Sequence, residues 1–362
     1  MSDAVLDLGQ LLWIGFHGTR ASRTLLDKIA AGRCGTTIVF KRNLEGGNGH
    51  TDLESLLALT AELHASAPDG TPCLIAVDQE GGVVQRVRAP ATVWPPMRMH
   101  DRHPDGDQAL SEQVGLAMGR ELHALGFDID FAPVLDIHTN PANPIIGDRA
   151  FGTDPETVAR RALAFARGLE QAGILACGKH FPGHGDTATD SHLELPRVEH
   201  AMERMDAVEL VPFARAAAAG LPMIMTAHVV FPAIEPGVPA TLSHKAITGL
   251  LRERLGYRGV IVSDDLDMKA ISDPAASAIA AINAGCDVLL LCNHEATQDS
   301  VEAALRTELE RSSEFRARVG DAAARVRAMK RRFAEQAVPR PARDIVGNAE
   351  HRALADQLRG SP

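Results

Sequence analysis

Short apolar runs recur along the chain, and segments with helical periodicity separate them. Eight of the runs have the length and composition of buried strands, and no clear hairpin signal lies between them. They are residues 11–16, 36–40, 73–77, 129–134, 174–178, 223–227, 259–262 and 287–292. Strands that are apolar throughout and alternate with helices are expected to be parallel and covered on both faces.

The segment 154–173 shows the pattern of the intervening helices. Thr153 or Asp154 can cap it, and Pro155 suits its first turn. Apolar residues then recur at helical spacing at Val158, Ala162, Phe165, Ala166 and Leu169. Segments 243–255 and 274–284 have a similar character, and residues 315–335 form a charged helix near the end of the chain.

Eight such units predict an α/β fold, a single (β/α)8 barrel, with a doubly wound open sheet as the alternative. Polar residues directly after most runs favour the barrel, because the carboxyl ends of barrel strands meet at one mouth. These residues are Lys41, Arg42, Asn43, Asp78, Gln79, Glu80, Asp136, Lys179, His180, His228, Asp264, Asp265, Asn293 and His294. We expect one catalytic domain over residues 1–335 and a surface tail over 336–362, where Pro339 and Pro341 oppose a helix.

Composition limits the partners of the chain. Its 362 residues carry a formal net charge of -10, which gives no general attraction to nucleic acid or an anionic membrane. The five cysteines are widely spaced without a CxxC pair, so we expect buried, reduced thiols. The amino terminus lacks a basic segment followed by an apolar one, and no run of about 18 apolar residues occurs. A cytoplasmic protein that acts on a small molecule is expected.

Residues 179–192 combine three histidines, two aspartates and a lysine directly after an apolar run. Such a concentration of titratable groups at a strand end predicts a catalytic loop, and its glycines allow backbone to approach a ligand closely. His180, His184, Asp186 and His192 could instead bind a metal ion. Their spacing lacks the helical pattern of a zinc protease, and Pro182 opposes a helix, so we expect no metal.

Five segments together resemble glycoside hydrolase family 3, within it the bacterial β-N-acetylhexosaminidase (NagZ) branch. They are residues 76–86, 147–152, 179–192, 225–228 and 259–266, and the resemblance spans about residues 8–335. It implies a single-barrel retaining exo-β-N-acetylglucosaminidase without a metal or organic cofactor. Its implied substrates are N-acetylglucosaminyl-1,6-anhydro-N-acetylmuramyl peptides from cell-wall turnover.

The resemblance also implies catalytic roles. Retaining glycoside hydrolysis needs a nucleophile for the anomeric carbon and a proton donor for the leaving oxygen. Asp264 matches the nucleophile, whereas the adjacent Asp265 is expected to have a structural or orienting role. His192, held by Asp190, matches the proton donor, and a carboxylate partner suits an imidazole that titrates near neutrality.

Further positions match sugar-binding and supporting residues of the family. Those implied to bind the sugar are Asp78, Arg86, Arg149, Lys179 and His180. We expect His184 to shape the loop by hydrogen bonding. His228 contacts substrate or supports the nucleophile strand, and Met268 lines an acetamido pocket or packs in the core.

Three other functions stay open. The first is a β-glucosidase or β-xylosidase of the same family, which aryl glycoside substrates would distinguish. The second is a sugar-binding sensor without catalysis, against which an intact nucleophile and proton donor argue. The third is a metal-dependent barrel hydrolase, which chelation would inactivate.

Overall fold

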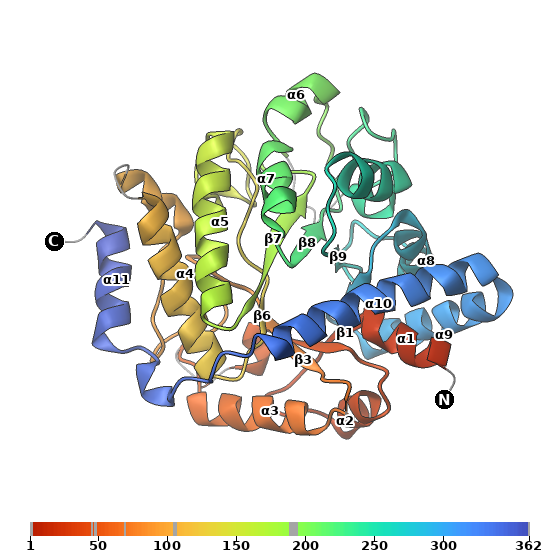
Figure 1. Ribbon diagram of the computed structural model, residues 1–362, viewed down its shortest axis with the longest axis horizontal. Helices are drawn as coiled ribbons and strands as arrows, with labels where there is room; N and C mark the ends of the chain where they lie inside the picture. The colour runs from red at the N-terminus through yellow and green to blue at the C-terminus, as the bar shows by residue number, and fades with distance from the viewer. Residues whose placement is uncertain are drawn as a thin grey trace.

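Eight parallel strands close into a barrel within the described part of the computed structural model, which covers residues 3–44, 46, 49–68, 70–103, 107–187 and 195–360 (Figure 1). In pairing order around the barrel they are β1 (Leu12–Gly15), β10 (Val288–Leu291), β9 (Val260–Asp265), β8 (Met223–Thr226), β7 (Leu175–Phe181), β6 (Ile129–Asp130), β3 (Leu74–Val77) and β2 (Thr36–Val39). Each predicted apolar run overlaps one of them, and β7 and β9 extend beyond the ends of their runs to Phe181 and Asp265. The predicted barrel is therefore confirmed, and the open sheet was the wrong alternative.

Alternating side chains of the strands build two buried clusters, as the two-residue period of a strand requires. The cluster inside the barrel includes Trp13, Ile38, Leu74, Ala76, Ile129, Phe131, Leu175, Cys177, Met223, Met225, Val260, Val262, Val288 and Leu290. The outward cluster, which packs against helices, includes Ile14, Val39, Ile75, Val77, Ala176, Ile224, Ile261, Leu289 and Leu291. The filled interior makes the barrel a rigid support for its carboxyl-terminal mouth.

Helices surround the strands, and their ends follow local sequence signals. In α5 (Pro155–Gln171), Asp154 accepts a hydrogen bond from the Thr157 amide at 2.8 Å, as the capping pattern predicts. The other α-helices are α1 (Asp3–Leu11), α2 (Arg23–Ala30), α3 (Leu53–Ala65), α4 (Asp107–Ala124), α6 (Met202–Ala207), α7 (Val211–Ala219), α8 (Pro274–Ala284), α9 (Glu295–Arg311), α10 (Ser313–Glu335) and α11 (Ala349–Arg359). Short 3-10 helices span Lys41–Asn43, Met97–Arg102, Gly147–Arg149, Ala240–Leu242 and Arg343–Ile345.

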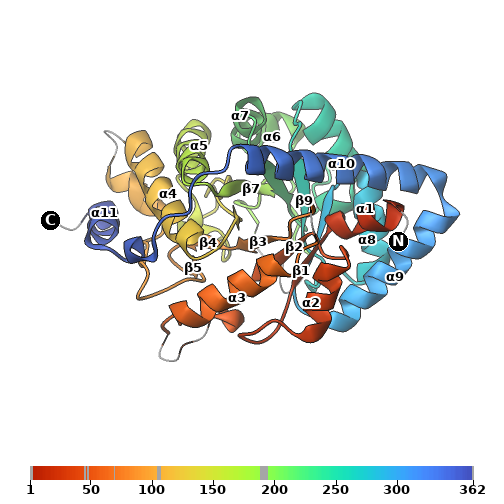
Figure 2. The same cartoon turned by 60° about the horizontal axis from the view of Figure 1, so that its bottom comes forward.

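The long helix α10 closes the amino-terminal end of the barrel and runs past the strands in Figures 1 and 2. Its buried Lys330 donates to the carbonyl oxygens of Gly35 at 2.6 Å and Pro72 at 2.8 Å. Gly35 directly precedes β2, and Pro72 lies two residues before the start of β3. The opposite end of the barrel is left for the candidate site.

Three local features differ from the sequence-based expectations. A short antiparallel pair, β4 (Gln79–Gly81) and β5 (Val84–Gln85), follows β3, although no hairpin was expected. The predicted helix near 243–255 spans Lys245–Arg254 with π-helical hydrogen bonding. Residues beyond 335 contain α11, which lies beside α4 in both views and was not predicted (Figures 1 and 2).

The five cysteines are buried and free, which confirms the expected thiols. Within the described residues, no helix combines the length and the apolar composition that a membrane span requires.

Candidate active site

A cavity of about 170 Å³ opens at the carboxyl ends of the strands. Its wall brings together side chains from the β4–β5 pair, β7, β8, β9 and β10, which are far apart in sequence. The lining residues are Phe40, Asp78, Glu80, Val84, Arg86, Phe131, Ile145, Arg149, Lys179, His180, His184, Met225, Asp264, Asp265, Met268, Leu290 and Cys292. Charged groups thus surround a small space above the apolar barrel interior.

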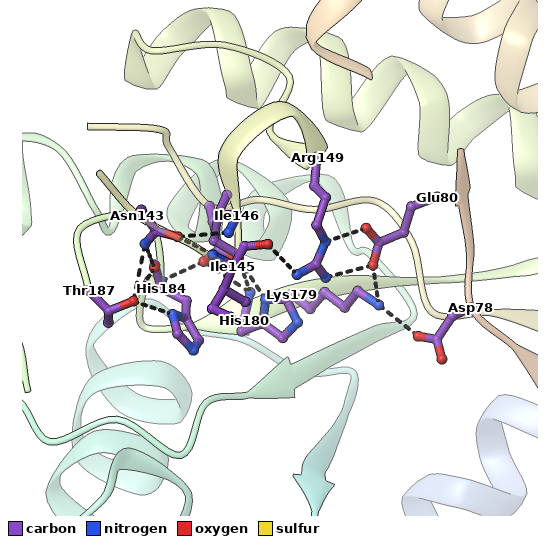
Figure 3. Close-up of polar contacts among 11 residues, drawn as sticks. Asp78, Glu80, Asn143, Ile145, Ile146, Arg149, Lys179, His180, His184 and Thr187 are labelled. Atoms are coloured by element: carbon purple, nitrogen blue, oxygen red, sulfur yellow. Dashed lines mark hydrogen bonds and ion pairs between the residues drawn. The ribbon is translucent and has the colours of Figure 1, made fainter. Parts of the chain in front are cut away.

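Lys179 lies at the centre of an ion network on one side of this cavity (Figure 3). Its ammonium nitrogen is 2.8 Å from Asp78 Oδ1 and 2.6 Å from Glu80 Oε1. Arg149 forms two parallel hydrogen bonds to Glu80, at 2.7 and 2.8 Å, while Arg86 contacts Asp78 at 3.2 Å. Each carboxylate is therefore shared by two cations, which fixes the positions of all five side chains.

The network keeps its members charged at neutral pH. Burial opposes ionisation of both carboxyls, but the cations outweigh it: Lys179 and Arg86 hold the pKa of Asp78 well below its usual value, and Arg149 and Lys179 lower that of Glu80 to about 2. Burial also opposes the charge on Lys179, yet the same carboxylates raise its pKa. The cavity wall consequently presents preorganised hydrogen-bond donors and acceptors of the kind that bind sugar hydroxyls.

Asp136 organises the two histidines on the next part of the wall. Its carboxylate lies 2.6 Å from His180 Nδ1 and accepts the His184 amide hydrogen at 2.6 Å. His184 Nδ1 in turn is 2.8 Å from the Thr187 hydroxyl. Burial, together with the neighbouring His180, lowers the pKa of His184 to about 4, so this ring is neutral at pH 7. Gly185 fits here because a Cβ would lie 1.7 Å from the Ile137 carbonyl oxygen.

Asp264 and Asp265 end β9 on the far side of the cavity and have different surroundings. The carboxylate of Asp265 accepts hydrogen bonds from the amides of Cys292 at 3.1 Å and Asp267 at 3.0 Å, and from Asn293 Nδ2 at 3.0 Å. The Asp264 carboxylate receives the Asp265 amide hydrogen at 2.8 Å. Asp265 thereby ties β9 to the end of β10, and its own amide orients Asp264.

His228 lies behind this pair and does not line the cavity described above. The fully buried ring donates from Nε2 to the Asp265 carbonyl oxygen at 3.0 Å, since a carbonyl can only accept. Its Nδ1 is 2.9 Å from the Thr241 hydroxyl. Of the two roles considered from the sequence, this placement favours support of the nucleophile strand.

The structure brings together most residues that the sequence singled out. Eight of them line the one cavity: Asp78, Arg86, Arg149, Lys179, His180, His184, Asp264 and Met268. Asp190 and His192 lie outside the described residues. Within the described chain no group of three or more histidine, cysteine, aspartate or glutamate side chains has a metal-binding arrangement, and Asp186 pairs with His200.

Glu80 and Asp136 were not selected from the sequence as site residues. Each lies shortly after a predicted strand, and this position was the sequence feature that could have pointed to them. Their importance becomes visible only through contacts with Arg149, Lys179 and His180, because residues up to 101 positions apart meet here.

A closed parallel barrel with a carboxylate-lined cavity at the carboxyl ends of its strands defines the class of (β/α)8-barrel enzymes. Residues 5–329 match the glycosyl hydrolase family 3 N terminal domain. The chain belongs to this family, which confirms the resemblance seen in the sequence.

Relatives and solved structures agree with the assignment. Beta-hexosaminidase of Alkalilimnicola ehrlichii is 45% identical over 306 residues, covering 83% of this chain and 84% of its own. A glycoside hydrolase family 3 beta-N-acetylglucosaminidase from Paenibacillus sp. superposes with a TM-score of 0.89 at 40% identity, over 99% of this chain and 68% of that chain. NagZ from Neisseria gonorrhoeae in complex with N-trifluoroacetyl-D-glucosamine gives 0.73 at 31% identity, over 87% and 98%.

Proposed function

We propose that this protein, a β-N-acetylhexosaminidase of glycosyl hydrolase family 3, removes terminal N-acetylglucosamine from 1,6-anhydro-N-acetylmuramyl peptides during peptidoglycan recycling in the cytoplasm. The observation that carries the proposal is the single cavity that both Asp264 and the Asp78, Lys179 and Glu80 network line. Its volume of about 170 Å³ suits a single pyranose ring, as an exo-acting enzyme requires.

In this proposal the ion network binds the sugar. Asp78 and Arg86 form one donor and acceptor pair, and Lys179, His180 and Arg149 supply further donors. The sugar ring lies between this wall and β9. There the Asp264 carboxylate attacks the anomeric carbon, the bond to the leaving oxygen breaks, and a glycosyl ester forms on Asp264. Water then cleaves the ester with overall retention.

His192, oriented by Asp190, gives its proton to the leaving oxygen and then takes one from the attacking water. His184 does not suit this task, because its pKa of about 4 leaves the ring neutral and its Nδ1 already contacts Thr187. His184 instead shapes the base of the loop. In this proposal Met268, which is 8% exposed and lines the cavity, contacts the acetamido group.

The proposal is tested with the 4-nitrophenyl N-acetyl-β-glucosaminide, β-glucoside and β-xyloside, and with the muropeptide itself. We expect rapid cleavage of 4-nitrophenyl N-acetyl-β-glucosaminide, cleavage of the N-acetylglucosaminyl-anhydromuramyl peptide with retention at the anomeric carbon, and insensitivity to a chelator. Faster cleavage of the β-glucoside or β-xyloside would make the protein a different glycosidase of the family. Sugar binding without turnover would make it a sensor, and loss of activity with chelator would point to a metal.

A further inference from the structure

Asp130 faces away from the barrel interior, between Ile129 and Phe131 of the interior cluster, and lies next to the strand that leads into the sugar-binding network. It ends β6, pairs with Val77 on one side and Ala176 on the other, and is fully buried. Neither the family resemblance nor the proposed mechanism gives this carboxyl a task. A buried carboxyl is costly unless its hydrogen bonds are used, so its contacts indicate what it does.

One contact is with the backbone that carries two of the sugar-binding carboxylates. Asp130 Oδ1 accepts the amide hydrogen of Gln79 at 2.9 Å. The regular ladder between β3 and β6 ends just before this point, where the Phe131 amide donates to the Val77 carbonyl at 2.8 Å. The Asp130 side chain therefore replaces the next backbone acceptor, at the residue between Asp78 and Glu80.

Gln79 passes this constraint on to Arg86. Its side-chain oxygen accepts the amide hydrogens of Arg86 and Val87, each at 3.0 Å, and its side-chain nitrogen donates to the Val87 carbonyl at 2.9 Å. Gln79 is itself buried. A continuous chain of hydrogen bonds thus runs from Asp130 through Gln79 to Arg86.

The second oxygen of Asp130 has no hydrogen-bond partner among the residues described. Burial raises the pKa of this carboxyl well above its usual value, and the neighbouring Asp78 and Glu80 charges act in the same direction. An amide of the same shape can supply the same acceptor, so the contribution of Asp130 is geometric.

We propose that Asp130 is a positioning residue for the sugar site, which holds the Gln79 amide so that Asp78, Glu80 and Arg86 face the cavity together. This role rests on the proposed sugar-binding function of those three side chains. A single acceptor at the end of β6 then sets both carboxylates that hold Lys179.

Two substitutions at one position separate geometry from folding. Asp130→Leu removes the acceptor and leaves the buried Gln79 amide unpaired. We expect KM for 4-nitrophenyl N-acetyl-β-glucosaminide to rise roughly tenfold with a smaller change in kcat, because sugar contacts weaken throughout the reaction. Asp130→Asn keeps the acceptor and is expected to restore KM to within about threefold of the wild type. Equal loss in both variants, or no loss in Asp130→Leu, would overturn the proposal.

Thr37→Val is the matched control, because Thr37 is also fully buried on a barrel strand and its hydroxyl has no partner among the described residues. Thr37→Val is expected to leave KM unchanged. A tenfold rise in KM there would mean that the Asp130 effect reflects only general disturbance of the barrel.

Crystal structures give a readout independent of activity. The 2.8 Å contact between Lys179 and Asp78 should persist in Asp130→Asn and be lost in Asp130→Leu. If the wild type fails to cleave the glycoside, the proposed function is wrong, while this contact still decides the positioning role.

Discussion

Two buried ion clusters lie at opposite ends of the barrel and use the same kinds of side chain. At the mouth, Lys179 and Arg149 surround Glu80 beside the cavity. At the amino-terminal end of the barrel, here called the floor, the fully buried Asp287 directly precedes β10 and contacts Arg252, Arg318 and Arg325. Both clusters place carboxylates among several cations, yet the remaining contacts of the cations differ.

Arg252 and Arg318 also donate to backbone carbonyl oxygens, and Arg318 and Arg325 pair with Asp321 as well. Arg318 donates to the carbonyl oxygens of Gly285 at 2.9 Å and Cys286 at 2.7 Å, and Arg252 donates to that of Tyr257 at 3.2 Å. They fasten α10 and the helix at 245–254 to the loops that start β9 and β10. The three mouth residues line the cavity that Asp264 also lines, whereas at the floor Arg325 borders a separate cavity of about 420 Å³ that Asp287 does not line. Ion pairing alone, even beside a cavity, therefore does not identify a functional site. At the mouth the additional feature is the carboxylate of Asp264 at the end of β9.

The largest effect is expected at the mouth, for Asp264→Asn. The amide is nearly isosteric but cannot form the glycosyl ester, so kcat should fall by at least about 10⁴-fold while the unfolding free energy stays near that of the wild type. Peptide mass mapping after reaction with a 5-fluoro N-acetylglucosaminide should place the label on Asp264. Label on Asp265, or near-normal turnover of Asp264→Asn, would move the nucleophile to another residue.

His192→Ala should lose roughly 10²- to 10⁴-fold in rate on substrates with poor leaving groups. Activated aryl glycosides need less protonation and should lose less in cleavage, with a burst when deglycosylation becomes limiting. Asp190→Ala should show a weaker form of this pattern. Rates across a series of aryl leaving groups measure it. If His184→Ala gave the leaving-group dependence and His192→Ala did not, the proton donor would be His184.

Asp287→Asn tests the comparison at the floor. Loss of this buried charge leaves Arg252 without its paired carboxylate, while Arg318 and Arg325 keep only Asp321, and the unfolding free energy should fall by about 3–5 kcal/mol. The kcat/KM of the folded fraction should stay within about twofold of the wild type, since no sugar contact changes.

Glu80→Gln at the mouth is the paired variant, and we expect it to lower kcat/KM by roughly tenfold or more. Denaturant unfolding and steady-state kinetics measure both. An equal loss of kcat/KM in Asp287→Asn and Glu80→Gln would contradict the assignment of a structural role to the floor cluster and a functional role to the mouth cluster.

The sequence predicted the barrel because its strands are locally encoded. Apolar runs and capping residues such as Asp154 define elements without reference to the rest of the chain. The polar residues after the runs also indicated the mouth, since every barrel strand points the same way. Those features follow from periodicity and direction alone.

The remaining features depend on contacts that periodicity does not encode. The Gly81-Gly82 pair, both residues with positive φ, marks the turn between β4 and β5, but strands of three and two residues give little pattern. In the tail, Asn348 caps α11 and His351, Ala355 and Leu358 are buried at helical spacing, a signal that the nearby prolines obscured. The pairing of Glu80 with Arg149 required the closed barrel itself.

The smallest expected effect concerns pH and again separates the two ends of the barrel. The pKa of His184 is lowered from 6.5 to about 4, mainly by burial, so between these values the unfolded chain binds a proton that the folded site does not. Stability should therefore decrease as pH falls from 6.5 toward 4, by about 1 kcal/mol per pH unit for this one group. Glu80, with its pKa lowered from 4.5 to about 2, adds a further loss below pH 4.5. His184→Gln should flatten the upper part of this dependence in denaturant titrations at pH 7, 6 and 5, whereas Asp287→Asn should shift the whole curve without changing its slope there. An unchanged slope in His184→Gln would mean that folding does not lower the pKa of His184, and the lowered pKa assigned to the mouth would be wrong.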